Sequence, residues 1–134
     1  MGNIYTIRNE DNVVIAAEPI YIGSESSNVE GFHVWSYHIT IKNKSGKAIQ
    51  LLNRYWNITD GNGVIQEVRG PGVIGLQPVI EPNQEFDYSS SVNLCTPCGI
   101  MFGHYEFKDA EGNLFNSNTP AFSLDSDEML RIPN

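Results

Sequence analysis

The fold is decided by the stretch FHVWSYHITIK, residues 32–42, in which large apolar side chains mostly alternate with smaller or more polar ones. Alternation with a period of two is typical of a β-strand with one buried face. The set expected to face the core is His33, Trp35, Tyr37, Ile39 and Ile41. The opposite set is Val34, Ser36, His38, Thr40 and Lys42. We therefore predict a strand over residues 32–42, buried on one side.

The sequence that follows predicts two chain reversals. Residues 43–47 (NKSGK) are turn formers with a glycine that can take a positive φ, so residues 48–59 are expected to form the returning antiparallel strand of a hairpin. Residues 60–63 (DGNG) make a second reversal, and residues 64–69 alternate again. Together these segments predict a meander.

Helix signals are almost absent from the rest of the chain, because glycine, asparagine and proline interrupt it at short intervals. Further strands are expected at residues 13–22, 85–92, 100–108 and 114–124, with Pro120 marking an interruption or an edge position in the last. About seven or eight strands at this spacing favour an all-β, immunoglobulin-like or fibronectin-III-like antiparallel β-sandwich.

Length and charge restrict the class of protein. The 134 residues are expected to form a single domain, 1–134, with its core at about 13–125 and looser ends at 1–10 and 126–134. A net charge of −8, with the basic residues scattered, disfavours nucleic acid and anionic membranes as partners. The chain shows no secretory signal or membrane-length apolar run, and its two cysteines suit a reducing compartment, so we expect a cytoplasmic protein.

The segment GPGVIG, residues 70–75, has the GxGxxG spacing of a nucleotide-binding loop. That chemistry needs a following helix whose N-terminus faces the phosphates, and Pro78 and Pro82 exclude a helix here. We therefore predict a loop between strands, whose glycines serve positive φ or close approach of another segment. Phosphate binding by the backbone of Gly70, Gly72 and Gly75 beside Arg69 is the alternative.

An arginine interrupts an apolar stripe in the second strand. Leu52, Arg54, Trp56 and Ile58 are expected to share one face. A buried arginine needs a partner, which is either a structural ion pair or aromatic ring, or an anion or carboxylate bound in a pocket. Arg69 favours the second possibility, because the two arginines would then flank the glycine loop.

Other motifs lack the parts that their chemistry requires. Cys95-Thr96-Pro97-Cys98 has no helix for a thioredoxin-like redox pair and too few further ligands for zinc, so we expect a turn with two incidental thiols. His38 and His104 fall on the polar phase of their strands, and His104 could join a surface site. No hydrolase or metalloprotease motif is present, so we expect no catalytic residue, metal site or cofactor.

Several segments, taken in order, resemble one family. They are the run 51–63 with its RYW at 54–56, the run 68–78 with GPGVIG and Gln77-Pro78, the tetrad Gly103-His104-Tyr105-Glu106, and Pro120. Over roughly residues 13–125 this set resembles the ApaG family. The resemblance implies a fibronectin-III-like sandwich and a genetic link to cobalt and magnesium efflux. It also implies a binding module, because the domain recurs in eukaryotic F-box and polymerase-delta-interacting proteins.

The sequence thus predicts a non-enzymatic module that binds another protein through an exposed strand face or the glycine loop. The candidate ligand- or partner-binding residues are Arg54, Arg69, Gly70, Gly72, Gly75 and His104. The alternative function is a phosphate or nucleotide sensor, for ligands such as diadenosine polyphosphates, that uses the glycine loop.

Overall fold

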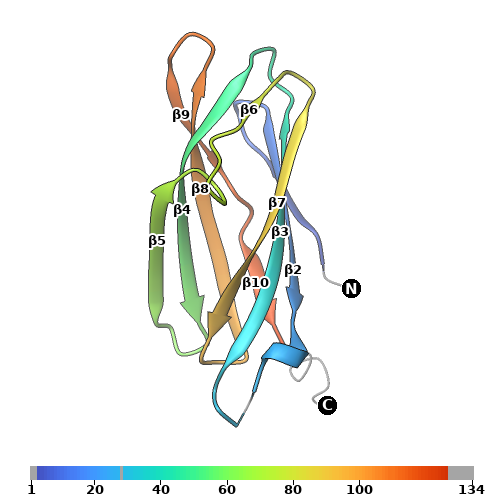
Figure 1. Cartoon of the computed structure of the whole chain (residues 1–134), viewed down its shortest axis with the longest axis vertical. Helices are drawn as coiled ribbons and strands as arrows, with labels where there is room; N and C mark the ends of the chain where they lie inside the picture. Colours follow the sequence, from blue (N-terminus) through green and yellow to red (C-terminus); the bar gives the residue numbers. More distant parts are fainter. Residues whose placement is uncertain (1–2, 28, 127–134) are drawn as a thin grey trace.

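The computed structural model describes residues 3–27 and 29–126 and shows an all-β sandwich of two antiparallel sheets packed face to face (Figure 1). The first sheet has the strand order β1 (Tyr5–Arg8), β2 (Val13–Tyr21), β3 (His33–Asn43) and β7 (Glu85–Leu94). The second has the order β10 (Phe122–Asp125), β8 (Cys98–Asp109), β4 (Ile49–Asp60) and β5 (Ile65–Pro71). Two short strands extend the second sheet: β6 (Val79–Ile80) pairs with β4, and β9 (Leu114–Asn118) pairs with β8.

The predicted inward face of β3 is confirmed. Trp35, Ile39 and Ile41 are at most 1% exposed, and Tyr37 is 6% exposed. Tyr37 meets Trp56 of the opposite sheet edge to face, with ring centroids 5.6 Å apart. Burial of each such side chain contributes about 1.5–3 kcal/mol, so this aromatic contact between the sheets holds the sandwich together.

The expected hairpin between β3 and β4 is wrong, because the two strands lie in different sheets. β3 pairs with β2 and β7 instead. At the end of β3 the fully buried side chain of Asn43 donates to the carbonyl oxygens of Lys47 (2.7 Å) and Ile80 (2.9 Å). Residues 43–47 therefore connect the first sheet to the second, and the side-chain amide of Asn43 links this turn to β6.

The other predicted reversals are confirmed. Asp60 begins the β4–β5 turn, and its carboxylate accepts from the backbone N–H groups of Asn62 and Val64. β8 forms the last hairpin with β9 across residues 110–113, and the chain then breaks at Pro120 before β10 rejoins β8. The predicted interruption at Pro120 therefore separates two strands that pair with different halves of β8.

The prediction of a looser end at residues 1–10 is wrong for part of that range. Residues 5–8 form the edge strand β1, which pairs with β2 from Tyr5↔Ala17 to Arg8↔Val14. The described part of the chain has ten strands, more than the seven or eight expected. The alternation pattern did not reveal the short strands β1 and β6, and it did not separate β9 from β10. The predicted loose end at 126–134 lies outside the described residues except for Ser126, which is buried.

A β-bulge in β4 decides which side chains face inward. The β4–β8 register shifts between Leu51 and Asn53, so Leu52 has no partner on β8. Before the bulge the buried residues are Ile49 and Leu51, and after it they are Trp56 and Ile58. The expected stripe through Leu52 is therefore wrong at its first member, since a bulge adds a residue and changes the alternation.

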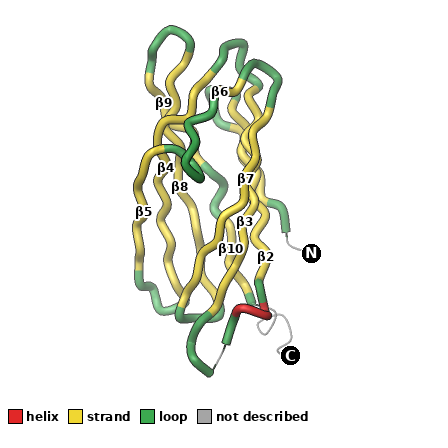
Figure 2. The backbone as a smooth tube through the Cα atoms, in the orientation of Figure 1, coloured by secondary structure: helices red, strands yellow, loops and turns green. Residues whose placement is uncertain are grey.

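Helical structure is confined, within the described ranges, to one short turn, η1 (Gly23–Glu25), drawn red in Figure 2. No helix in residues 3–27 or 29–126 has the length and apolar character that a bilayer span requires.

Candidate functional site

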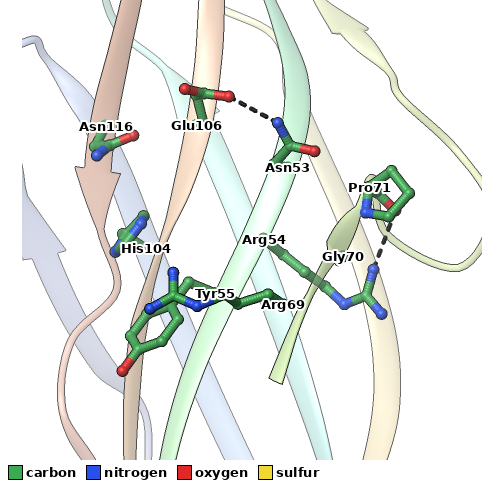
Figure 3. Close-up of a pocket in the computed structure, with 9 residues that line it drawn as sticks. All are labelled: Asn53, Arg54, Tyr55, Arg69, Gly70, Pro71, His104, Glu106 and Asn116. Atoms are coloured by element: carbon green, nitrogen blue, oxygen red, sulfur yellow. Dashed lines mark hydrogen bonds between the residues drawn. The ribbon is translucent and has the colours of Figure 1, made fainter. Parts of the chain in front are cut away.

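Tyr55 is the centre of a row of stacked side chains on the outer face of the second sheet. It lies on β4, directly opposite Arg69 of β5 and His104 of β8. The Cζ of Arg69 is 4.3 Å from the centroid of the Tyr55 ring, and the His104 ring stacks on Tyr55 at 5.0 Å with an interplanar angle of 28°. The strand register thus builds a cation–π and aromatic stack across three strands, as Figure 3 shows.

Acidic and amide groups fix the ends of this row. The Tyr55 hydroxyl donates to Glu67 Oε2 (2.5 Å), whose same oxygen lies 3.7 Å from Arg69 Nη2. Asn53 donates to Glu106 Oε1 (2.7 Å) one row further along. Because these groups restrain one another, the stack presents a fixed surface rather than free side chains.

His104 is held in its neutral form at neutral pH. Burial lowers its pKa below the ordinary value of 6.5, the charge of Arg69 lowers it further, and Glu106 acts in the opposite direction. A neutral imidazole can stack on Tyr55 beside a guanidinium without adding a second positive charge to the face.

The stack lines a shallow cavity of about 410 Å³. Its lining residues are Asn53, Arg54, Tyr55, Arg69, Gly70, Pro71, His104, Glu106 and Asn116 (Figure 3). Four of the residues expected from the sequence therefore come together here, namely Arg54, Arg69, Gly70 and His104. The other two, Gly72 and Gly75, lie beyond the cavity in the loop after β5.

The two arginines do not share one face. Arg54 follows the inward alternation of Trp56, and its side chain runs behind β4 toward Pro71, whereas Arg69 lies on the outer side with Tyr55 (Figure 3). Nη1 of Arg54 donates to the carbonyl oxygens of Pro71 (3.1 Å) and Gly72 (2.9 Å). Among the described residues Arg54 forms no ion pair and no cation–π contact, so its hydrogen-bond partner is the backbone of the glycine loop.

Each glycine of this segment is required for a different geometric reason. A Cβ on Gly70 would come within 3.1 Å of the Arg54 guanidinium, and one on Gly72 would lie 2.2 Å from the carbonyl oxygen of Leu76. Gly72 and Gly75 also have positive φ values, +61° and +78°. The predicted loop between strands is confirmed from Gly72 onward, whereas Gly70 and Pro71 still belong to β5. Its glycines serve positive φ and close approach.

Three backbone N–H groups of the loop already donate hydrogen bonds within the protein. The N–H of Gly72 donates to Leu52 O, and Val73 and Leu76 exchange two backbone hydrogen bonds of 2.8 Å around a two-residue turn. Ile74 and Gly75 form that turn with φ values of 43° and 78°, as a type I′ turn requires. These N–H groups therefore point into the protein rather than toward a ligand.

Exposed apolar side chains extend the same outer face. Ile100 and Phe102 precede His104 on β8, and Ile65 lies two strands away on β5. They are between 41% and 60% exposed. Sequence reasoning missed Tyr55, Phe102 and Ile65 as site residues, because only the register of three strands shows that they adjoin Arg69 and His104.

The first sheet carries a second cluster that sequence reasoning missed. His38 contacts Ser89 Oγ through Nδ1 (2.7 Å) and Asp87 Oδ2 through Nε2 (3.0 Å) on its outer face. The three residue types are those of a hydrolase triad, but the two ring nitrogens are exchanged, because a triad histidine contacts its serine through Nε2 and its carboxylate through Nδ1. The His38 and Asp87 side chains are 39% and 61% exposed, and neither Ser89 nor Asp87 lines a described cavity, so the cluster lacks a water-excluding pocket.

The thiols lie apart from both clusters. Cys95 and Cys98 are free, and the turn between them is closed by Thr96, whose hydroxyl accepts from Gly61 N (2.8 Å) and donates to Cys98 O (2.7 Å). In the described part of the chain no three His, Cys, Asp or Glu side chains are arranged to hold a metal ion.

Comparison with known proteins gives a consistent result. A family model described as the ApaG domain matches residues 23–109. Protein ApaG of Rhizobium etli is 49% identical over 123 residues, covering 92% of this chain and 95% of that protein. Protein ApaG of Parvibaculum lavamentivorans is 46% identical, covering 90% and 93%. The crystal structure of the putative ApaA protein of Bordetella pertussis is 34% identical with a TM-score of 0.83, covering 85% of this chain and 93% of that one.

Proposed function

The chain belongs to the ApaG domain family, and we propose that it is a non-enzymatic module that binds a protein partner through the outer face of the second sheet. We place this module in the cytoplasm and relate its sandwich to the immunoglobulin and fibronectin-III kind. The observation that carries the proposal is the stack of Arg69, Tyr55 and His104 beside exposed apolar side chains.

The composition of this face supports the proposal. The outer face of a sandwich sheet in water is usually polar, whereas this one presents Tyr55, Phe102 and Ile100 around Arg69. Tyrosine, phenylalanine and arginine are the residues enriched in the centres of protein interfaces. The restraint of Tyr55 and Arg69 by Glu67 supports the proposal further, because ordered side chains lose less entropy on binding.

The expected partner surface follows from the same residues. It offers apolar side chains to Phe102 and Ile100 and a carboxylate or carbonyl group to Arg69. Loss of a central anchor of this kind typically costs 2 kcal/mol or more, which is about a 30-fold loss of affinity.

The test compares two variants of equal chemistry. Phe102→Glu places a charge in the proposed interface, and Ile20→Glu places one on the outer face of the first sheet; the two original side chains are 41% and 43% exposed. Proteins retained from native lysate by each immobilised variant are quantified by mass spectrometry. We expect at least one protein to be retained by the wild type and by Ile20→Glu and lost with Phe102→Glu. Equal retention by all three, or turnover of a substrate by the purified wild type, contradicts the proposal.

A phosphate or nucleotide sensor is the second candidate, and Arg69 beside Gly70 in one cavity favours it. Its weakness is that the N–H groups of Gly72, Val73 and Leu76 already donate to carbonyl oxygens. Titration with ATP, GTP and diadenosine polyphosphates tests it, since binding at the loop must move the amide resonances of residues 70–75. The link to cobalt and magnesium efflux stays a prediction of the family resemblance.

A further inference from the structure

A second cavity opens between the two sheets at one side of the sandwich. β5 ends the second sheet and β7 ends the first, and Figure 1 shows these two strands in their separate sheets. The slot has a volume of about 290 Å³. Its lining residues are Tyr37, Arg54, Trp56, Ile58, Gln66, Val68, Ser90, Ser91, Val92 and Asn93.

Arg54 is the one charged residue in that lining. The protein has 16 acidic side chains against 8 basic ones, yet within the described ranges none of the acids forms an ion pair with Arg54. Arg54 is half-buried, and a guanidinium partly removed from water without an opposite charge loses solvation that other groups must replace. The two carbonyl oxygens of Pro71 and Gly72 compensate it only in part, because both accept from Nη1.

The same two carbonyl oxygens fix the orientation of Arg54. With Nη1 occupied by the loop, the guanidinium keeps Nη2 and Nε as donors for which the described residues provide no hydrogen-bond acceptor. A pre-oriented guanidinium loses little entropy when it binds an oxyanion, and its planar donors match the geometry of phosphate and carboxylate oxygens.

Neutral donors surround this charge. The hydroxyls of Tyr37 and Ser90 face each other across the β3–β7 pair on the inner side, and Gln66 and Asn93 add amide groups at the mouth. Burial raises the pKa of Tyr37, while the Ser90 hydroxyl and the charge of Arg54 act against this effect. The phenol therefore remains protonated at neutral pH and can donate.

Trp56 adds an unused donor to the lining. Its indole Nε1 is buried without a well-formed hydrogen bond in the described part of the protein, although it lies near enough to the Tyr88 hydroxyl to lower the pKa of that group slightly. A buried N–H without a partner costs free energy that a bound acceptor, or a ligand-induced shift of Tyr88, can recover.

We propose that the slot between β5 and β7 is a binding site for a small phosphate-class oxyanion, held by Nη2 and Nε of Arg54 and by the hydroxyls of Tyr37 and Ser90. Arg54 also lines the outer cavity, but the site is distinct from the outer-face stack, because the side chains of Arg54 and Arg69 lie on opposite faces of the sheet. It goes beyond the proposed protein interface and does not depend on it. The net charge of −8 repels anions in general, so occupancy here requires specific contacts.

The two tryptophans provide an internal comparison for the test. Trp56 lines the slot, whereas the indole N–H of Trp35 donates to the carbonyl oxygen of Asp125 (2.9 Å). In a ¹H–¹⁵N spectrum of the full chain, titration with inorganic phosphate and pyrophosphate is expected to move the Trp56 indole resonance saturably. The Trp35 resonance is expected to stay in place, and sodium chloride at matched ionic strength is expected to move neither. A Trp56 resonance that fails to move, or that moves equally with chloride, overturns the proposal.

Two pairs of variants locate the charge that binds. Arg54→Gln is expected to weaken phosphate binding by about 10- to 100-fold, since hydrogen bonds to charged groups contribute about 1.5–3 kcal/mol. Arg69→Gln makes the same charge change on the outer face and is expected to leave binding unchanged. Equal loss with both variants overturns the proposal, because it assigns the anion to the outer cavity.

A second pair of variants tests the site even if the Arg54→Gln protein does not fold. Ser90→Asp introduces a carboxylate into the slot and is expected to compete with phosphate for Arg54, whereas Ser89→Asp makes the same change on the outer side of β7. Loss of binding with Ser90→Asp alone supports the site. Undiminished binding by Ser90→Asp overturns it.

Discussion

The guanidinium of Arg54 occupies the space that a side chain on Gly70 would need. The two residues are direct neighbours on β4 and β5, and a Cβ at position 70 would lie 3.1 Å from both Nη1 and Nη2. Gly70→Ala is therefore expected to push the guanidinium away by a few tenths of an ångström and to destabilise the protein by about 1 kcal/mol. Urea unfolding measures this, with Gly46→Ala as the control, because no atom lies within 4 Å of a Cβ there.

Gly72→Ala is expected to be more harmful than Gly75→Ala. Both positions have positive φ, which costs an alanine about 1 kcal/mol. Only at Gly72 would the new Cβ also overlap the Leu76 carbonyl oxygen, so a further cost of about 1–3 kcal/mol is expected from the forced backbone shift. Denaturant midpoints of the two variants measure the difference. Equal midpoints would show that the loop can move away from position 72.

Arg69→Gln is expected to raise the pKa of His104, because the charge of Arg69 is one of the two effects that lower it. Glu106→Gln is the opposite control and is expected to lower the same pKa. Between the depressed folded pKa and 6.5 the unfolded chain binds more protons, so this group's contribution to stability falls as pH drops below about 6.5. NMR titration of the His104 ring protons measures both shifts, and a change in the same direction for both variants would contradict the assignment.

The hydroxyls of Tyr88 and Tyr105 are expected to show coupled effects on stability. They lie 2.5 Å apart in the core, and burial raises the pKa of each. Tyr88→Phe or Tyr105→Phe leaves one buried hydroxyl without its partner and is expected to cost about 1–3 kcal/mol. The double variant removes both hydroxyls, so its cost is expected to be smaller than the sum. Additive costs from a double-mutant cycle in urea would mean that the bond contributes nothing.

Ser89 is expected to be unreactive toward a fluorophosphonate probe, despite its contact with His38. Stabilisation of an oxyanion requires an enclosed pocket with hydrogen-bond donors beside the serine. The described cavity that His38 lines does not include Ser89. Intact-protein mass spectrometry measures labelling, with Ser89→Ala as the reference. Labelling of the wild type that this variant abolishes would show a nucleophilic serine and would contradict the non-enzymatic proposal.

The sequence was sufficient for the long strands and for two of their hairpins, and insufficient for the short strands and for the pairing of β3. Alternation identified β3 and its inward face, and the DGNG turn identified the β4–β5 hairpin, because both depend on neighbouring residues. The crossing from β3 to β4 depends on the bonds from Asn43 to Lys47 and Ile80, and the second of these spans 37 residues. Local periodicity carries no information on such a contact.

The candidate sites show the same division. Arg54 was recognisable because it interrupts an apolar stripe in its strand. Arg69 was recognisable because it precedes the glycine loop, and His104 because it falls on the polar side of its strand. Their separation onto opposite faces was not predictable without the register. Tyr55 gave no signal by itself, since its role depends on lying opposite both Arg69 and His104.

The bulge gives β4 one residue, Leu52, that can be lost without exchanging the two faces of the strand. Deletion of the single codon for Leu52 would leave Leu51 and Arg54 facing inward and Tyr55 facing outward, since the extra residue has no partner on β8. Insertion of one residue after Asn53 would instead turn Tyr55 toward the core and Arg54 toward solvent, because a shift of one residue exchanges the faces of a strand. Among relatives, a change in the length of β4 is therefore expected at position 52 before it is expected between Asn53 and Ile58.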